Sequence, residues 1–329
     1  LFTFFSCCDE LCSFDPGWIL LPFSKRAQTS KIIPRNGRLL GAAGNRGIVV
    51  AKSSVLNVQP GVTGAARIVA KFGGSSLAST DQLHKVRAII EADERRKIIV
   101  PSAPGKRDAK DTKITDLLYL CHHAASVDAD FSGAYEQIVE RFTGIEKDLG
   151  NTPTIGQHLE QFRGALSQGV TADYAASRGE HFCGLLLAAW LGAEFVEPAE
   201  CIVISANGLV DPQTWELLGQ RLSDTSKRYV IPGFYGRDAE GHIRTFSRGG
   251  SDVSGAVAAR AANAILYENW TDVSGLLMAD PRIVDQPRPM EEVTYAEIRE
   301  LSYMGASVLH EEAMAPVREV GIPVNIRNT

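Results

Sequence analysis

The chain has 329 residues, of which 44% are hydrophobic and 22% are charged, and this globular composition argues against disorder of the whole chain. No apolar run approaches the roughly 20 residues that a transmembrane helix needs, so we expect a soluble protein without a membrane partner. The net charge of −5 is unevenly distributed, because residues 1–67 hold 8 Lys/Arg and 3 Asp/Glu whereas residues 68–329 hold 26 and 36. Such an acidic body is a poor binder of nucleic acid.

The first 66 residues differ in character from the rest of the chain. Residues 1–23 are rich in Phe, Leu and Cys, and residues 25–67 contain no acidic residue and no sustained apolar period. This composition predicts a disordered leader over residues 1–66, either transit-like or outside the translated frame, with a folded domain from residue 67 to residue 329.

The six cysteines are scattered along the chain. Cys121, Cys183 and Cys201 lie in apolar segments that look buried. They predict reduced thiols and a cytoplasmic location, with the plastid stroma as the alternative if the basic leader is a transit peptide.

Short apolar runs alternate with helical patterns from Arg67 onward. Strands are predicted over residues 68–70, 97–100, 194–196, 201–204, 228–231, 264–267 and 323–326. Helices are predicted near residues 114–126, 131–149, 173–192, 252–262 and 294–304, and between the first two strands, where Leu83, Val86, Ile89 and Ile90 share one face. This alternation predicts an α/β protein, a three-layer αβα sandwich with a largely parallel central sheet.

The first segment that carries chemistry runs from Lys71 to Ser76, directly after a predicted strand. Its two glycines allow a tight turn whose N–H groups can meet phosphate oxygens, and Lys71 supplies a cation. The turn is not a Walker A loop, and the signatures of protein kinases are absent from the chain. The alternative is an ordinary turn between a strand and a helix.

The second segment runs from Ser247 to Asp252 and precedes an alanine-rich helix. Arg248 suits a carboxylate or a phosphate, and Asp252 can hold a lysine or a metal. A capping aspartate after a glycine turn is also common in structural loops. This segment therefore indicates a binding site only in combination with the other segments.

Two further segments carry polar groups. Thr271 to Gly275 follows a predicted strand, where open α/β sheets bind ligands. The segment Ser177 to His181 interrupts a long helical region, and its Glu180 could bind a substrate amine, although a solvated helix charge is the equal alternative. His181 is better explained as a structural residue than as a catalytic one.

Together these segments resemble the aspartokinases of the amino-acid kinase family, in the family's order. Lys71 to Ser76 matches K-F-G-G-[TS]-S, Ser177 to Glu180 matches S-x-G-E, Arg248 to Asp252 matches R-G-G-S-D, Thr271 to Gly275 matches T-D-V-x-G, and Asp280 to Arg282 matches D-P-R. With Val100 to Leu118 and Gly305 to His310, the likeness covers residues 67–329.

The resemblance implies the amino-acid kinase fold, with a substrate lobe over about residues 67–225 and a nucleotide lobe over about 226–329. It implies ATP-dependent phosphorylation of the β-carboxylate of L-aspartate to 4-phospho-L-aspartate, the first step of the pathway to lysine, threonine and methionine. The implied cofactors are ATP and Mg²⁺. A homo-oligomer is implied if regulatory ACT domains are present in the full-length protein.

The resemblance also implies roles for single residues. Lys71 and Asp252 would form the catalytic pair, with Asp252 orienting the lysine toward the transferred phosphoryl group. The substrate would be bound by Thr115, Glu180, Arg248 and Ser251. The nucleotide site would be lined by Lys71, Phe72, Gly73, Gly74, Thr271, Asp272 and Arg282. No residue is assigned to a metal.

Two residues depart from the family pattern. Many aspartokinases have Tyr at the position of Leu277 and Lys at that of Ser307, so the affinity for nucleotide is in question. The chain also ends at Thr329, where family members continue into two ACT domains, and feedback inhibition by lysine or threonine is therefore not supported.

Two other functions remain open. A sibling kinase acting on glutamate or acetylglutamate is disfavoured by Glu180, because an acetylated amine would not need that carboxylate. A catalytically weak nucleotide-binding remnant is favoured by Ser307 and the missing ACT domains, and is opposed by the intact Lys71, Arg248 and Asp252.

Overall fold

The computed structural model describes residues 48–51 and 66–329, apart from positions 153, 248, 274, 276, 280–282, 289 and 304–310. All of them belong to a unit that runs from Gly44 to Thr329. Among the helices of these described residues, none is both long and apolar enough to cross a membrane.

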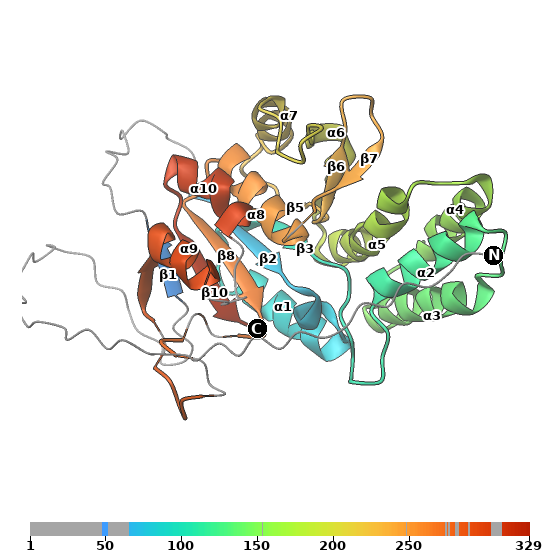
Figure 1. Ribbon diagram of the computed structural model, residues 1–329, viewed down its shortest axis with the longest axis horizontal. Helices are drawn as coiled ribbons and strands as arrows, with labels where there is room; N and C mark the ends of the chain where they lie inside the picture. Colours follow the sequence, from blue (N-terminus) through green and yellow to red (C-terminus); the bar gives the residue numbers. More distant parts are fainter. Residues whose placement is uncertain are drawn as a thin grey trace, which may run out of the picture. The chain divides into compact units, whose positions relative to one another are not determined.

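An eight-stranded sheet forms the centre of this unit (Figure 1). The strands of the described residues, including two that lie outside this sheet, are β1 (Ile48–Ala51), β2 (Ile68–Phe72), β3 (Arg96–Pro101), β4 (Glu194–Phe195), β5 (Tyr229–Val230), β6 (Tyr235–Arg237), β7 (Ile243–Thr245), β8 (Leu266–Thr271), β9 (Glu292–Thr294) and β10 (Val324–Asn328). The order in the sheet is β4-β5-β3-β2-β8-β10-β1-β9, and β6 and β7 form a separate hairpin. From β4 to β10 all neighbours are parallel, whereas β1 runs antiparallel to β10. The predicted, largely parallel sheet is confirmed.

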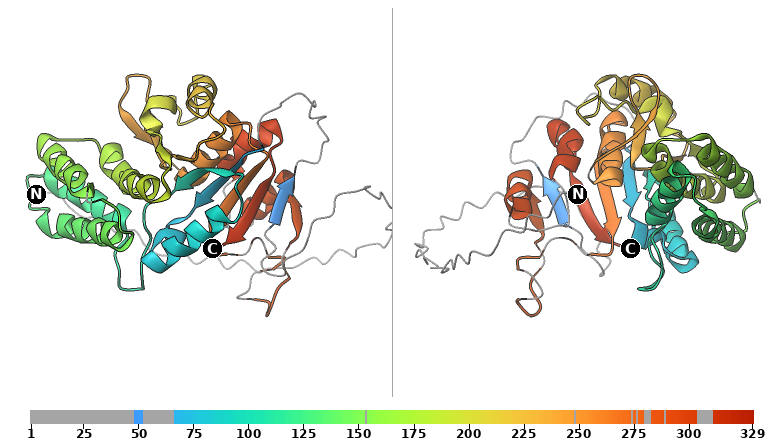
Figure 2. Two further views of the ribbon diagram at one scale, coloured as in Figure 1. Left: turned by 180° about the vertical axis from the view of Figure 1, so that it is seen from behind. Right: turned by 45° about the vertical axis from the view of Figure 1, so that its right-hand side comes forward.

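Helices cover both faces of this sheet (Figure 2). They are η1 (Gly74–Leu77), α1 (Thr80–Glu91), α2 (Ile114–Ser126), α3 (Ser132–Asp148), α4 (Ile155–Gln168), α5 (Ala172–Leu191), α6 (Pro198–Cys201), α7 (Gln213–Arg221), α8 (Gly250–Ala261), α9 (Tyr295–Tyr303), η2 (Glu311–Met314) and α10 (Ala315–Val320). Both views of Figure 2 show α2 to α5, drawn in shades of green, gathered beside the sheet.

The alternation of side chains along β2 divides the core into two clusters. Val69 packs with residues of α7, α8 and α10 on one face, whereas Ala70 and Phe72 pack with α1 to α5 on the other. Every residue of β2 is buried, which is expected of a central strand covered by helices on both sides. The predicted three-layer αβα sandwich is therefore confirmed. The same alternation directs Lys71 to the face of α8.

A buried ionic network crosses the sheet on the face of α1. The guanidinium of Arg96 donates from Nε to Oε2 of Glu268 over 2.7 Å and from Nη2 to Oε1 over 3.0 Å. The same carboxylate accepts from Nη1 of Arg327 at 3.1 Å and from Nε1 of Trp270 at 3.0 Å. Glu268 thus ties β3, β8 and β10 together.

Two predictions about local structure need correction. The run 201–204 was predicted as a strand, but its first residue ends the helix α6 (Pro198–Cys201), because proline suits the first turn of a helix and the side chain of Glu197 caps it. Val203 and Ile204 form isolated β-bridges, to Arg237 and Val210, so the prediction holds only for these two residues. Residues Ile48–Ala51, placed in a disordered leader by their composition, form β1 and pair with β10 and β9. β1 lies between β10 and β9 in the sheet, and its four residues are too few to show the sustained apolar period that was sought there.

Candidate active site

Four of the predicted site residues lie at the carboxyl ends of β2 and β8, two neighbouring strands of the sheet. Lys71 lies near the end of β2, and Gly73 and Gly74 follow it. Thr271 ends β8, which runs parallel to β2. The carboxyl edge of a parallel sheet is where α/β proteins bind ligands, so the topology brings these segments to one place.

Lys71 is held by two partners from distant parts of the chain. Its Nζ lies 2.6 Å from Oδ1 of Asp252, in the first turn of α8, and 3.3 Å from Oδ1 of Asn269. Asn269 in turn donates from Nδ2 to Oδ1 of Asp252 over 2.9 Å. The three side chains form a closed triangle that fixes a buried ammonium group at the end of β2.

Sequence reasoning found Lys71 and Asp252 but missed Asn269. The register of β2 and β8 places Asn269 directly opposite Lys71, and both side chains point toward α8. The sequence shows only that Asn269 is a polar residue between Glu268 and Trp270 in a predicted strand region. Its contact with Lys71 can be inferred only when the register of β8 against β2 is known.

The turn after Lys71 packs against two other segments through its backbone. The N–H of Gly73 donates to the carbonyl of Trp270 over 2.9 Å, so this N–H is not free for a phosphate as expected. Gly74 and Ser75 begin η1, and their N–H groups have no partner within a helix that starts there. These two groups, beside the ammonium of Lys71, are the donors that the turn offers to an anion.

Glu180 lies in α5 and is buried, with 6% of its surface exposed. Burial raises the pKa of its carboxyl group to about 7, and a hydrogen bond from the N–H of Ala103 and the charge of Lys71 offset only part of this effect. Its Oε2 atom has no hydrogen-bond partner. A buried carboxylate with one open oxygen near a lysine is suited to receive a cationic group from a ligand.

The helix that carries Thr115 packs directly on the helix that carries Glu180. A Cβ atom on Gly179 would lie 2.8 Å from Cβ of Ala103 and 3.2 Å from Cδ1 of Leu118, so only glycine lets α2, α5 and the loop after β3 approach this closely. Thr115, half-buried in the first turn of α2, is thereby brought toward the site.

Ser251 lies in the first turn of α8, next to Asp252. Its Oγ and Cβ atoms would both be 2.6 Å from a Cβ on Gly233, so the turn of α8 packs against the loop after β5. The structure therefore places Ser251 on the same helix turn as the partner of Lys71.

The structure describes only some of the residues that were predicted to line the nucleotide site. The ring of Phe72 is fully buried and stacks on Trp270 with 6.1 Å between ring centroids, so its predicted contact with the nucleotide would fall to its backbone. Asp272 is exposed and accepts a hydrogen bond at Oδ1 from Thr271 Oγ1 over 3.1 Å. Three further positions lie outside the described residues: Arg248, Arg282 and Ser307.

His181 is engaged away from Glu180. Its Nδ1 atom lies 3.0 Å from Oε2 of Glu197 and 3.1 Å from the hydroxyl of Tyr235. Burial lowers the pKa of His181, so its ring is uncharged at neutral pH. These contacts favour a structural role that ties α5 to α6 and β6.

The comparison with known families decides which fold family this geometry represents. The family model described as "Amino acid kinase family" matches residues 66–328. The chain belongs to the amino acid kinase family. The membership that the motifs indicated is thus confirmed over most of the chain.

Aspartokinases are among the family members to which the chain is similar. It is 38% identical over 276 residues to aspartokinase 3 of Bacillus subtilis (strain 168), which covers 79% of this chain and 61% of that protein. It matches the crystal structure of the aspartate kinase of Clostridium acetobutylicum with a TM-score of 0.76 and 49% identity, over 79% of this chain and 60% of that one.

A third relative was solved with ligands. The E. coli aspartokinase III in complex with aspartate and ADP matches with a TM-score of 0.68 and 26% identity, over 80% of this chain and 62% of that one. The chain therefore spans about six tenths of the length of these relatives. The resemblance to aspartokinases inferred from the motifs is confirmed for this portion.

Proposed function

We propose that the chain is the catalytic part of an aspartate kinase, which transfers the γ-phosphoryl group of ATP to the β-carboxylate of L-aspartate and yields 4-phospho-L-aspartate and ADP. The observation that carries the proposal is the buried Lys71–Asp252 pair beside the turn after β2, residues 73–76, here called the phosphate turn, together with the open carboxylate oxygen of Glu180 within the field of the same lysine. The similarity to enzymes named as aspartokinases supports it. The reaction would begin the pathway to lysine, threonine and methionine.

Lys71 would stabilise the charge that develops on the transferred phosphoryl group. A β-carboxylate is ionised at neutral pH, so its oxygen can attack the γ-phosphorus directly while the bond to the bridging oxygen of ADP breaks. No covalent enzyme intermediate is needed. Catalysis then reduces to positioning the two reactants and stabilising charge, and Asp252 and Asn269 would hold the ammonium in place for this task.

ATP would bind with its phosphates at the turn after β2. The turn fits phosphates because Lys71 lies at its base, and the absence of a side chain on Gly73, whose Cβ would lie 3.6 Å from Nζ of Lys71, leaves the ammonium unobstructed on that side. Thr271, Asp272 and Arg282 would line the nucleotide site beside it. Mg²⁺ carried by the phosphates of ATP would supply further charge neutralisation.

Glu180 would bind the α-ammonium group of aspartate, and Arg248 its α-carboxylate. An ammonium near a buried carboxylate favours the ionised form, so substrate binding would release the proton that burial retains on Glu180. Thr115 and Ser251 would contact the substrate from the walls formed by α2 and α8. Acetylation of the amine would remove this attraction.

We further propose that residues 67–329 form the catalytic domain, with a substrate lobe to about residue 225 and a nucleotide lobe beyond it. The protein would form homo-oligomers through ACT domains where the full-length chain has them. Cys121, Cys183 and Cys201 are buried and free, which supports the proposal of a reducing, cytoplasmic location.

The proposal is tested by trapping the acyl phosphate. The purified chain is incubated with MgATP, L-aspartate and hydroxylamine, and the aspartyl hydroxamate is measured against a reaction without aspartate and one with the Lys71→Ala variant. Hydroxamate that needs both aspartate and Lys71 is the expected result. Product from glutamate or acetylglutamate instead would assign a sibling kinase, and nucleotide binding without any product would assign the inactive remnant.

A further inference from the structure

Arg141, in α3, is a buried cation outside the proposed substrate contacts. It exposes only 6% of its surface. Its Nη2 atom donates to two backbone carbonyls, those of Ala78 and Gly105, each at 2.6 Å. Its Nη1 atom donates to Oδ2 of Asp111 over 2.9 Å. One guanidinium group therefore joins the segment after the phosphate turn to the loop after β3.

The loop after β3 touches both halves of the proposed site. The N–H of Gly105 donates to the carbonyl of Gly74 over 2.8 Å, which binds the loop to the phosphate turn. Two residues earlier, Ala103 packs on α5 beside Glu180, where a Cβ atom on Gly179 would lie 2.8 Å from Cβ of Ala103, and the N–H of Ala103 lowers the pKa of the Glu180 carboxyl group. A shift of this loop would move the acceptor site and the phosphate turn relative to each other.

The loop after β3 and the phosphate turn are in direct backbone contact. A Cβ atom on Gly105 would lie 2.7 Å from the carbonyl carbon of Gly74, so the two backbones touch without intervening side chains. Their separation is therefore set by the groups that hold the loop from outside.

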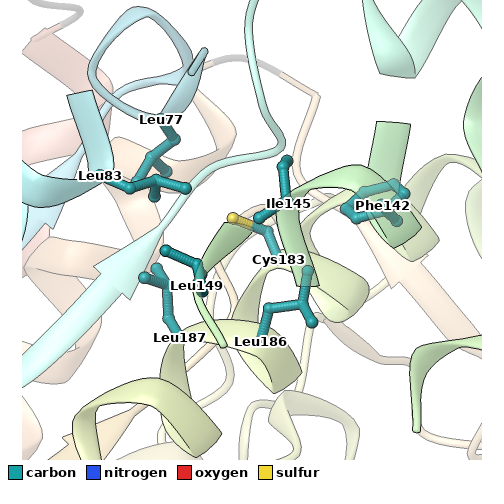
Figure 3. Close-up of a pocket in the computed structure, with 8 residues that line it drawn as sticks. All are labelled: Leu77, Leu83, Phe142, Ile145, Leu149, Cys183, Leu186 and Leu187. Atoms are coloured by element: carbon teal, nitrogen blue, oxygen red, sulfur yellow. The ribbon is translucent and has the colours of Figure 1, made fainter. Parts of the chain in front are cut away.

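Helix α3 provides a fixed base for Arg141. Phe142, the residue after Arg141, and Ile145 line a small space together with Leu77 of η1 and Cys183 of α5 (Figure 3). This space is too small for a water molecule. All eight side chains around it are apolar or a thiol, and Figure 3 shows them converging from η1, α1, α3 and α5. Close packing of this kind resists small displacements.

We propose that Arg141 is a positioning residue that sets the distance between the phosphate turn and the carboxylate of Glu180. The inference rests on the proposed function, because its catalytic effect is exerted through those two elements. Arg141 acts on them indirectly, because its side chain binds the carbonyls of Ala78 and Gly105. A misplacement of about 1 Å between reacting groups can lower a rate by roughly 10²-fold.

The planar fork of arginine is what this position requires. It reaches two carbonyls and a carboxylate at once, whereas the single ammonium of lysine cannot satisfy all three with the same geometry. Arg107 offers a matched control, because it also binds Asp111, with Nε 3.0 Å from Oδ2, but half of its side chain is exposed and no contact joins it to either carbonyl among the described hydrogen bonds.

The first test is steady-state kinetics of Arg141→Met, Arg141→Lys and Arg107→Met in the whole chain, with the active fraction measured for each. Arg141→Met should lower kcat by roughly 10²-fold, with KM for aspartate and MgATP changed by less than about threefold, and Arg141→Lys should fall between it and the wild type. Arg107→Met should stay within about twofold of the wild-type kcat. Equal effects of the Arg141 and Arg107 variants, or a loss explained wholly by unfolded protein, would overturn the inference.

A second readout does not depend on activity. In Arg141→Lys, amide hydrogen exchange should accelerate in residues 73–78 and 102–106 and should not change in the strands of the sheet. In Arg107→Met, exchange in both of these segments should stay unchanged. Unaltered exchange in the two segments would refute the role of Arg141 even if the wild-type enzyme is active. Absence of hydroxamate from the wild type would instead refute the proposed function and leave the exchange result to decide on Arg141.

Discussion

The Nζ atom of Lys71 lies 2.6 Å from Oδ1 of Asp252, and both side chains are largely shielded from solvent. The lysine comes from a central strand and the aspartate from the first turn of the helix above it. Because removal of one partner from a buried ion pair leaves an uncompensated charge, each residue depends on the other for its position. The pair therefore fixes the position of the ammonium group of Lys71, the proposed catalytic cation, independently of any bound substrate.

Lys71→Ala is expected to lower kcat by roughly 10²-fold or more with a smaller change in KM, because preorganised charge acts mainly in the transition state. Lys71→Arg should restore little activity, since a planar guanidinium does not replace a compact ammonium. Kinetics with both substrates saturating, together with circular dichroism, measure the effect, and the exposed Lys85→Ala serves as control. A folded Lys71→Ala enzyme that keeps more than about a tenth of kcat would contradict the catalytic role.

KM for aspartate is expected to fall as the pH rises from 6 to 8. With a pKa of about 7, Glu180 is protonated below this range and ionised above it, and only the ionised form attracts the substrate ammonium. Glu180→Gln should raise KM for aspartate, remove this pH dependence and leave KM for ATP nearly unchanged. A flat profile in the wild type, or equal changes in both KM values, would reassign Glu180 to a structural role.

Gly179→Ala is expected to lower both stability and activity. The new methyl group would lie 2.8 Å from Cβ of Ala103, and overpacking of this kind costs about 1–3 kcal/mol of unfolding free energy. Gly164, on the exposed face of α4 with no atom within 4 Å of an added Cβ, is the matched control, and Gly164→Ala should stabilise by about 0.5–1 kcal/mol. Urea denaturation of both variants tests the pair, and changes of the same sign would be evidence against this packing.

Glu268→Gln is expected to destabilise the domain by about 3 kcal/mol, because Arg96 and Arg327 lose their shared counter-charge inside the sheet. Glu136→Gln, at an exposed position of α3, should change the unfolding free energy by less than about 0.5 kcal/mol. Urea denaturation at pH 7 compares the two. Similar values would mean that the network in the sheet contributes no net charge stabilisation.

Those parts of the fold and site that depend on local pattern were predictable from sequence. The strand before Lys71 was recognised by its apolar run and the helix α5 by its long period, and both lie where expected. The short helix α6 was not, because four residues carry no period and the start signal of Glu197 and Pro198 was overlooked.

Contacts that depend on register were beyond single-sequence reasoning. Asn269 became meaningful only when β8 was placed beside β2, and Arg141 resembled any charged residue of a surface helix until its burial was known. Both act through partners that are distant in the chain, and no local spacing encodes such pairs.

The pairing of β2 with β8 has a consequence for how the proposed kinase would acquire activity. Lys71 and Asn269 are 198 positions apart, so closing their contact is among the costly, non-local steps of folding, and such pairings slow the folding of parallel sheets. A nascent chain released only as far as residue 249 would contain the whole phosphate turn but neither Asp252 nor Asn269. Turnover would then begin only once β8 had docked on β2, so the first detectable phosphoryl transfer would report the pairing of β8 with β2 during synthesis.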